Sequence, residues 1–360
     1  MAEARNIETL SVLFTAGVVA GTLVPGPFSG ALAGALLPLL ALPVLFRRRL
    51  SLLPSGVATG LILGIFALLG FFCALSAAQS VIQQDGWLSA VAQSAVQRLR
   101  GCIEGIPFPS PLTAPLLKAF LTGDRSSLPA DTVAIFRSSG ASHLLALSGL
   151  HIGILYLLMD KLSALAGRSP AARVFRAAGV VMAAGFFTLM CGATPSLVRA
   201  FLFILISESL RLTGRPRKPV RVLCLALLLQ LVLDPAAIRS IGFQLSYLAM
   251  AGIFLLYPLL DSWFPDSGRT NPMRRIWQAA ALSISCQLFT APLVWFRFHT
   301  FPRFFLLTNL MAIPLTTGLM YAAVGTVFLA ALGYCPDVLI QATDGLCRLL
   351  LWVLETIASL

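Results

Sequence analysis

The 360-residue chain is 58% hydrophobic and only 11% charged, whereas ordinary soluble domains carry roughly 25% charged residues. Together with a mean hydropathy of +0.88, this composition excludes a soluble globular protein and predicts a polytopic helical membrane protein. The formal net charge of +12 is not by itself a sign of nucleic-acid binding, because Lys and Arg gather on the cytoplasmic loops of membrane proteins.

The apolar segments predict an all-α fold with about twelve transmembrane or membrane-associated helices, since each crossing needs roughly 20 apolar residues. They lie at residues 10–25, 27–46, 56–78, 142–159, 177–192, 196–212, 222–233, 240–260, 276–294, 305–319, 320–334 and 344–358. We therefore expect an N-terminal membrane block at 1–80, an extracytoplasmic amphipathic and linker region at 81–141, and a second membrane block at 142–360.

The basic clusters predict the orientation. With the N-terminus in the cytoplasm, the clusters at 47–49, 168–176, 211–221 and 269–275 all fall on the cytoplasmic side. The opposite orientation would put each of them on the outer face, against the usual distribution of Lys and Arg. We expect both termini to be cytoplasmic, and the first apolar segment, which lacks a small-residue cleavage site, to be retained.

The region between the membrane blocks shows a mixed pattern. Its first apolar residues recur at helical spacing, which favours an amphipathic helix on the membrane surface; they are Trp87, Leu88, Val91, Ala95, Val96 and Leu99. The proline-rich run at 106–115 is incompatible with a helix or a central strand. Two short helices should follow, separated by a turn at Gly123 and Asp124, the second beginning at Pro129 and ending near Gly140.

The segment SHLLALSGLHIGILYLLM at 142–159 reads as a membrane helix that carries two histidines, two serines and an internal glycine. At 100° per residue, Ser148 and His151 lie about 60° apart and can share an interior face. Polar groups at this depth need a partner or water, so they predict a pore or gate. The alternative is that both histidines bond to backbone carbonyls and Gly149 only permits close helix packing.

Arg199 lies about one turn inside the span that begins TPSLVRAFLF. A guanidinium there needs a counter-charge or water. Asp131, Asp234 or a transported phosphate are the candidates, and snorkelling to the nearby surface is the alternative.

Two further polar residues, Gln244 and Ser246, lie in the motif GFQLSYLAMAG and can line the same cavity, with interhelical hydrogen bonds as the alternative. His299, within FRFHTFPRF, is interpreted as an interfacial loop residue among aromatics. The seven cysteines have no CxxC spacing, which favours buried thiols, and a disulfide between Cys102 and Cys335 remains open.

Several catalytic signatures are missing from the sequence. It has no GxxxxGK[ST] phosphate loop, and its three histidines form no HExxH string, so ATP hydrolysis, a metal and a cofactor are not expected. An intramembrane hydrolase built on Ser148 and His151 is a weaker alternative, because neither an orienting acid nor an oxyanion hole is evident. We expect that the chain is not an enzyme.

Four motifs carry a resemblance to a known family. They are LTGDRSSLP at 121–129, HLLALSGLHIG at 143–153, TPSLVRA at 194–200 and GFQLSYLAMAGI at 242–253. In this order and spacing, the chain from about Pro115 onward resembles the membrane core of the ComEC family of competence proteins. Members of that family are inner-membrane channels through which bacteria import single-stranded DNA during natural transformation.

The resemblance implies a helical DNA conduit in the bacterial cytoplasmic membrane, with 142–360 as its channel domain. Candidate residues along the DNA path are Arg137, Ser142, His143, Ser148, Gly149, His151, Arg199, Gln244 and Ser246, with Phe136 and Phe201 for stacking or gating. The implied partners are single-stranded DNA, the lipid bilayer, a cytoplasmic motor ATPase and an external DNA receptor. A homo-oligomer and a separately encoded nuclease are further possibilities.

Longer family members also carry an OB-like domain and a metallo-β-lactamase-like domain. The interval 79–115 is too short for a complete OB barrel, and the sequence contains no metallo-β-lactamase-like domain. We expect a reduced member, to which strand degradation cannot be transferred. A small-solute or ion transporter and a decayed homologue are the remaining alternatives.

Overall fold

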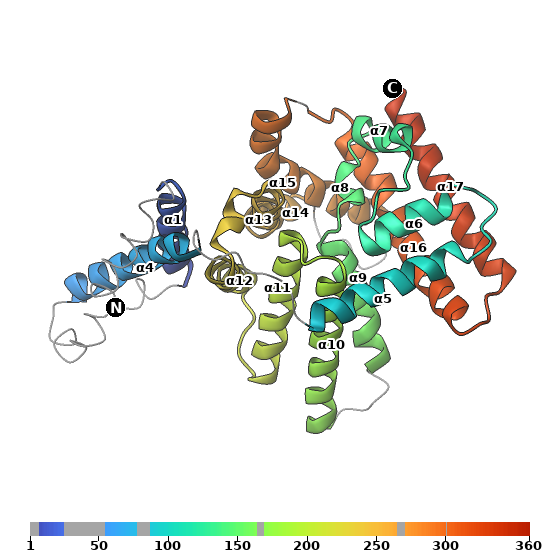
Figure 1. Ribbon diagram of the computed structural model, residues 1–360. Coiled ribbons are helices and arrows are strands. Elements are labelled where there is room, and N and C mark those ends of the chain that lie inside the picture. The colour runs from blue at the N-terminus through green and yellow to red at the C-terminus, as the bar shows by residue number, and fades with distance from the viewer. Residues whose placement is uncertain (1–6, 25–54, 78–86, 164–168, 265–270, 300) are drawn as a thin grey trace. The chain divides into compact units, whose positions relative to one another are not determined.

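The computed structural model describes residues 7–24, 55–77, 87–163, 169–264, 271–299 and 301–360 (Figure 1). Within these ranges every regular element is a helix, so the predicted all-α fold is confirmed. The expected span at 27–46 and the basic cluster at 47–49 lie outside the described residues.

The chain forms two compact units, one made of Met1–Gln84 and Leu202–Gln244, the other of Asp85–Phe201 and Leu245–Leu360. The helices of the first unit are α1 (Ile7–Thr22), α4 (Ser55–Ala77), α12 (Pro219–Leu233) and the 3-10 helix η3 (Pro235–Arg239). The second unit contains α5 (Trp87–Glu104), α6 (Thr113–Thr122), α7 (Ala130–Ser138), α8 (Ser142–Leu145), α9 (Gly149–Ser163), α10 (Pro170–Met190), α14 (Tyr257–Asp261), α15 (Pro272–Phe298), α16 (Phe305–Ala331) and α17 (Asp337–Ala358). The unit boundaries fall within α11 (Pro195–Leu212) and α13 (Ile241–Leu255).

In the first unit, α1 and α4 pack backbone to backbone. A Cβ atom added at Gly17 would lie 1.9 Å from the carbonyl oxygen of Ala67, and one added at Gly70 would lie 2.1 Å from that of Phe14. Only glycine fits at both positions. The crossing is therefore of the small-residue type that membrane helices use for close packing.

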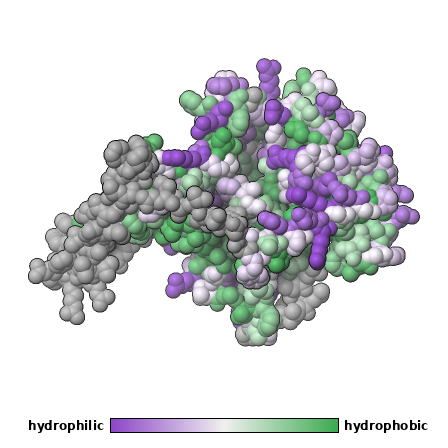
Figure 2. Space-filling view, viewed as in Figure 1, coloured by the Kyte–Doolittle hydropathy of each residue, from purple (hydrophilic) through white to green (hydrophobic). Residues whose placement is uncertain are grey.

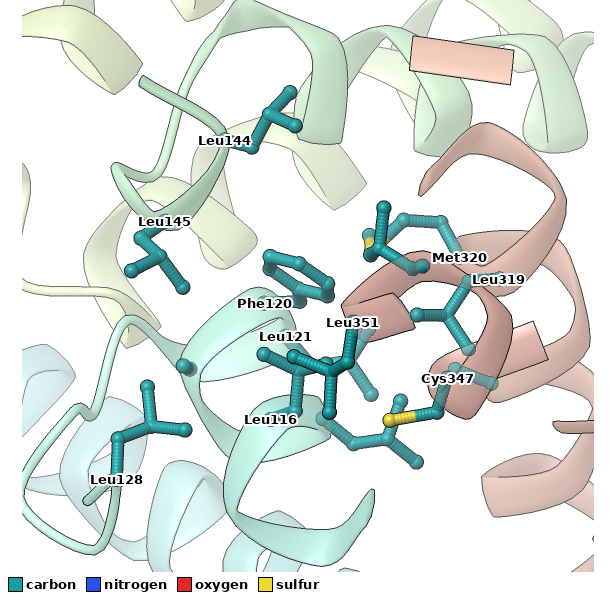
Figure 3. Packing of buried hydrophobic residues seen from close by; sticks show 14 of the residues in the cluster. Leu116, Phe120, Leu121, Leu128, Leu144, Leu145, Leu319, Met320, Cys347 and Leu351 are labelled. Carbon is teal, nitrogen blue, oxygen red and sulfur yellow. The ribbon is translucent and has the colours of Figure 1, made fainter. Parts of the chain in front are cut away.

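The core of the second unit joins the short helices α6, α7 and α8 to α16 and α17. Figure 3 shows Phe120 of α6 with residues of the other elements around it. The labelled neighbours include Leu144, Leu145, Leu319, Met320, Cys347 and Leu351. Full burial of each large apolar side chain contributes about 1.5–3 kcal/mol, so this cluster fixes the position of α6 and α8.

Asp344 of α17 anchors the segment that precedes α6. Its Oδ1 accepts hydrogen bonds from the N–H of Ser110 (3.0 Å) and the hydroxyl of Thr113 (2.6 Å). The proline-rich run at 106–115 is non-helical only as far as residue 112. Our expectation was wrong at its end, because Pro115 lies in the first turn of α6, where a missing N–H costs little.

The short helices and the amphipathic helix agree with the sequence. The helices α6 and α7 flank Gly123, and Pro129 precedes α7. The predicted helix from Trp87 is α5, which buries Val96 but leaves Trp87 75% exposed. In Figure 2, hydrophilic side chains gather over the area where α5 and α6 lie in Figure 1.

Four expected spans have different boundaries in the structure. The segments 305–319 and 320–334 form one continuous helix, α16, in which the hydroxyl of Thr317 bonds to the carbonyl of Ile313 (2.8 Å) and does not end the helix. The span at 240–260 divides into α13 and α14 near Pro258, which cannot continue the backbone hydrogen bonds. The span at 142–159 is also interrupted, between α8 and α9.

Within the described residues, four helical segments are long and apolar enough to cross a bilayer: Ala171–Met190, Ile241–Asp261, Pro272–Phe298 and Phe305–Ala331. Three shorter apolar helices lie at Ile7–Thr22, Gly60–Ser76 and Pro219–Leu233. The chain is a helical membrane protein, and the expected total of about twelve spans is not confirmed.

Candidate functional site

The break between α8 and α9 is the centre of the candidate site. Ala146 adopts an extended conformation (φ −78°, ψ 130°) and ends α8. The N–H of Ser148 donates to Nδ1 of His151 (3.1 Å), while the N–H of His151 donates to the carbonyl of Ser148 (3.2 Å). Ser148 and His151 meet as the sequence predicted, but at a capped helix end and not across the face of a continuous helix.

The turn between α6 and α7 holds this break in place. The carbonyl of Leu145, freed by the end of α8, accepts hydrogen bonds from Nε (3.1 Å) and Nη2 (2.7 Å) of Arg125. Leu147 packs on Gly123, where a Cβ would lie 2.5 Å from Cδ1 of Leu147 and where φ is +77°. The motifs at 121–129 and 143–153 therefore form one structural unit.

The contacts of His151 define where its proton resides. Because Nδ1 accepts the N–H of Ser148, the neutral ring must carry its hydrogen on Nε2. The residue is only 3% exposed, and Nε2 has no hydrogen-bond partner among the described residues. A buried donor left in this state costs about 1–3 kcal/mol, which makes it a candidate contact for water or an anion.

Arg199 of α11 lies beside the same break. It is 8% exposed, it donates through Nη1 to the carbonyl of Ser246, and its guanidinium carbon lies 5.9 Å from the ring centroid of Tyr247. A Cβ added at Gly149 would lie 3.4 Å from Nη2 of Arg199. The guanidinium thus lies against Gly149 at the start of α9.

Neither expected carboxylate neutralises Arg199. Among the described residues, the ion pairs do not include Arg199. Asp131 is exposed on α7, and Asp234 caps η3 by accepting the N–H of Ala237 (3.2 Å). The guanidinium is buried against α13 and does not extend to the surface.

Three candidates lie at the junction of α7 and α8, away from the buried pair. Arg137, Ser142 and His143 are exposed. The Nδ1–H of His143 donates to the carbonyl of Gly140 (3.3 Å). These three exposed residues precede the break along the chain, and we call them the outer group.

The remaining candidates differ in position. Phe136 is fully buried and packs edge-on against Phe120 (6.3 Å between centroids), so it belongs to the core and is not open to stacking. Gln244 donates from its amide to the carbonyl of Ile238 (2.7 Å) within the first unit. Phe201 lies against Gly185, where a Cβ would be 3.1 Å from its ring.

Sequence reasoning missed Arg125 and Tyr247. Tyr247 adjoins Ser246 in a motif already singled out, so its position could have been noticed. Arg125 likewise lies in the motif at 121–129, but its contact is with a carbonyl 20 residues away, which no local spacing indicates.

The site does not contain a complete hydrolytic arrangement within the described residues. The hydroxyl of Ser148 lies 3.2 Å from Nδ1 of His151, a distance suited to a nucleophile and base. However, Nδ1 is also engaged by the N–H of Ser148, and Nε2 has no carboxylate partner to orient the ring in the part of the chain that is described.

The described residues also contain no group of three His, Cys, Asp or Glu side chains suited to holding a metal ion. All seven cysteines are free thiols. Those of Cys102 and Cys335, the pair left open above, contact the carbonyls of Val327 (3.8 Å) and Thr326 (3.7 Å).

Known proteins with a similar sequence were found by comparison. The chain is 30% identical over 209 residues to the uncharacterized protein YcaI of Escherichia coli, covering 54% of this chain and 26% of the relative. It is 24% identical to ComE operon protein 3 of Bacillus subtilis (56% and 24% covered) and 26% identical to Recombination protein 2 of Haemophilus influenzae (65% and 30% covered). The match spans less than a third of each relative, and no solved structure matches.

The family described as Competence protein matches residues 120–360. That range covers more than half of the chain and includes all four motifs identified in the sequence. The chain therefore belongs to the competence protein family, as its resemblance to ComEC indicated.

Proposed function

We propose that this chain forms a helical conduit that imports single-stranded DNA across the bacterial cytoplasmic membrane during natural transformation. Membership of the competence family supports this function, and the structural observation that carries it is the α8–α9 break with the buried His151 and Arg199 beside it. Because the curated relatives are much longer than the matched segment, their activities are a proposal for this chain.

An interrupted helix is costly within a membrane. Irregular backbone is tolerated at that depth only where protein buries it or where it lines a water-filled cavity. Here Arg125 satisfies the carbonyl end of α8, while the first turn of α9 presents the positive end of its dipole. Such a break suits a segment that borders an aqueous path.

The polar groups at the break are donors that favour an anion. The Nε2–H of His151 has no acceptor among the described residues, and Arg199 is buried without a carboxylate in that part of the chain. A guanidinium and a neutral N–H can both contact phosphate oxygens. A DNA strand moving through the path would supply these phosphate oxygens one after another. Between two phosphates, the side chains of His151 and Arg199 would bind water instead.

We assign the candidate residues to two positions along this path. Arg137, Ser142 and His143 lie at the outer end, and Ser148, Gly149, His151, Arg199 and Ser246 lie at the inner position. Gln244 remains a candidate through its family motif, and Phe201 remains a candidate gate.

The N-terminus is proposed to be cytoplasmic, which places residues 81–141 and the outer group outside the membrane. The cytoplasmic C-terminus was expected from an even number of crossings. That number counted residues 305–334 as two spans, whereas α16 forms a single helix there. Reporter fusions after residues 141, 300 and 360 would determine each sidedness separately.

The partners follow from the proposed transport. Single-stranded DNA and the lipid bilayer are the direct ones, and a cytoplasmic motor ATPase and an external receptor would drive and feed the conduit. A homo-oligomer or a separate nuclease would be compatible with it. The chain itself is proposed to act as a channel and not as an enzyme.

A transporter of small anions is the alternative, because the donors of His151 and Arg199 would also bind a free anion. Uptake of labelled inorganic phosphate that depends on Arg199, with unchanged transformation, would favour it. Covalent labelling of Ser148 by a serine-directed probe would revive the less favoured hydrolase.

The test is transformation frequency in a deletion strain complemented with variants of the chain. We expect deletion to abolish transformation, and Arg199→Ala or His151→Ala to lower it at least about tenfold at equal protein level, as expected for losing a contact to a charged group. Arg98→Ala, an exposed arginine of α5, is the matched control. Unchanged transformation after deletion would reject the proposal.

A further inference from the structure

The end of α15 and the connection that leads on to α16 form a stretch of unusual composition. Its described residues, 295–299 and 301–304, include five aromatic side chains and three basic or imidazole side chains. We call these residues the aromatic-basic loop. From the sequence, His299 was interpreted as an interfacial loop residue among aromatics. None of the candidate residues along the proposed DNA path lies in this loop.

The side chains of this loop are turned outward. Phe296 is 78% exposed and Phe298 is 52% exposed. Phe301 is 49% exposed and is held at one side by Phe305, with ring centroids 6.3 Å apart and planes at 75°. About half of its surface is exposed, which leaves area for a base to stack on the ring.

The loop is fastened to the outer end of the candidate path. Pro302 packs on Gly140, where a Cβ would lie 2.7 Å from the proline ring and φ is +81°. The hydroxyl of Thr308 donates to the carbonyl of Ser139 (2.6 Å). In Figure 1 the chain linking α15 to α16 accordingly passes beside α7 and α8. The loop therefore adjoins the segment that carries Arg137 and His143.

The charge of this part of the chain has a single sign. Between residues 271 and 336 the sequence contains no Asp or Glu. Arg297 and Arg303 are exposed, and among the described residues neither has a carboxylate at ion-pair distance. Exposed aromatic rings beside unneutralised arginines suit a flexible polyanion with flat bases.

The turn itself is held in an uncommon conformation. His299 has φ +51°, a left-handed value that non-glycine residues seldom adopt. Its N–H donates to the carbonyl of Trp295 (2.9 Å) and closes the end of α15. Beyond the end of the helix, Pro302 lies next to Gly140, and Phe301 and Arg303 flank it in the chain.

We propose that the aromatic-basic loop is the docking surface for the incoming single strand, with Phe301 stacking on a base and Arg297 and Arg303 contacting phosphates. The inference rests on the proposed function and adds where the strand is first held. The rival occupant is the lipid interface, where Trp, Phe and Arg also gather. The two occupants make different demands on Phe301. Contact with lipid requires only an apolar side chain of similar volume, whereas stacking on a base requires the aromatic ring.

The test measures binding of fluorescent oligonucleotides to the full chain in lipid nanodiscs. The probes are a 20-nucleotide dT strand and an abasic strand of equal length, which keeps the phosphates and removes the bases. Phe301→Leu should weaken binding of the dT strand about fivefold or more and leave binding of the abasic strand unchanged. Arg297→Gln with Arg303→Gln should weaken both strands and reduce the salt slope of log K by about 1.4.

A matched pair elsewhere serves as the control. Arg173 and Phe175 of α10 are two positions apart, as Phe301 and Arg303 are, and both are exposed, with Phe175 at 80%. Arg173→Gln with Phe175→Leu should bind both strands as the unchanged chain does. Thermal unfolding identifies misfolded variants, and the arginine double variant, which alters only exposed side chains, keeps the test open if Phe301→Leu fails to fold.

The inference is overturned if the unchanged chain binds neither strand, if the loop variants bind both strands normally, or if the control loses as much binding as they do. A drop in thermal stability with normal DNA binding would assign the loop to lipid. If the deletion strain needs the chain for transformation while loop variants transform normally, only the loop assignment falls. If deletion has no effect on transformation, the proposed function falls first.

Discussion

The α1–α4 crossing and the α8–α9 break use glycine and serine in opposite ways. In the crossing, Gly17 and Gly70 bring two backbones into contact. The hydroxyl of Ser11 donates a hydrogen bond to the carbonyl of Ile7 in its own helix (2.6 Å). At the break, Gly149 lies against a guanidinium, and the N–H of Ser148 is capped by the imidazole of His151. Small polar residues in a membrane segment therefore indicate either dry packing or a functional path, and the fate of their hydrogen bonds separates the two.

The largest expected effect is the loss of folded protein when the dry crossing is disturbed. Gly70→Val would push a side chain against the carbonyl of Phe14. Overpacking of this kind typically lowers the free energy of unfolding by about 1–3 kcal/mol. Gly64→Val on the same helix has open space around it and should be tolerated. Protein level and thermal unfolding in detergent give the comparison. Equal stability of the two variants would mean that the crossing is loosely packed.

A smaller effect on stability, with a clear effect on transport, is expected at the break. Arg125→Gln removes the guanidinium contacts to the carbonyl of Leu145, which are worth about 1.5–3 kcal/mol as charge-assisted bonds. The protein should remain in the membrane while transformation falls. Arg98→Gln, which alters an exposed arginine of α5, is the control. Normal transformation by Arg125→Gln would show that the break does not depend on this contact.

The smallest effect concerns acid stability of the α6–α7 turn. Hydrogen bonds from Ser126 and, secondarily, the guanidinium of Arg100 (3.1 Å away) hold the pKa of Asp124 below its ordinary value of 3.8. A lowered pKa in the folded state means that the stabilisation is present above the unfolded value and is lost as the pH falls through the folded value. The contribution should be under about 1 kcal/mol, because the pair is near the surface.

Thermal unfolding between pH 7 and pH 3 would measure this contribution. Asp124→Asn should be slightly less stable at neutral pH, and its difference from the unchanged chain should shrink as the pH approaches 3. A difference that stays constant over this range would contradict the assigned role of the carboxylate.

The sequence predicted the helical class, the two short helices and the meeting of Ser148 with His151, because these depend on hydropathy and local spacing. It did not predict the break that joins them. Residues Leu144 to Leu147 are apolar and contain neither Gly nor Pro, so the only local signal is the Ser148–Gly149 pair that follows them, which was interpreted as part of a continuous span. The end is fixed by Arg125 and Gly123, which reach the break only through the tertiary fold.

The opposite error occurred in α16. Thr316, Thr317 and Gly318 resemble a helix boundary, and two spans were expected around them. The hydroxyl of Thr317 instead bonds back to the preceding turn (2.8 Å), and the apolar run is long enough to continue. The length of the hydrophobic segment thus outweighed the low helix propensity of these three residues.

The cap at His151 restricts how protons can move along this part of the protein. Its Nδ1 receives the N–H of Ser148, so a proton added there would set two donors against each other and break the cap at the start of α9. A proton relay through this imidazole would therefore have to give up that hydrogen bond each time the ring took up a proton. Proton movement at this point would disturb the same break that borders the proposed path.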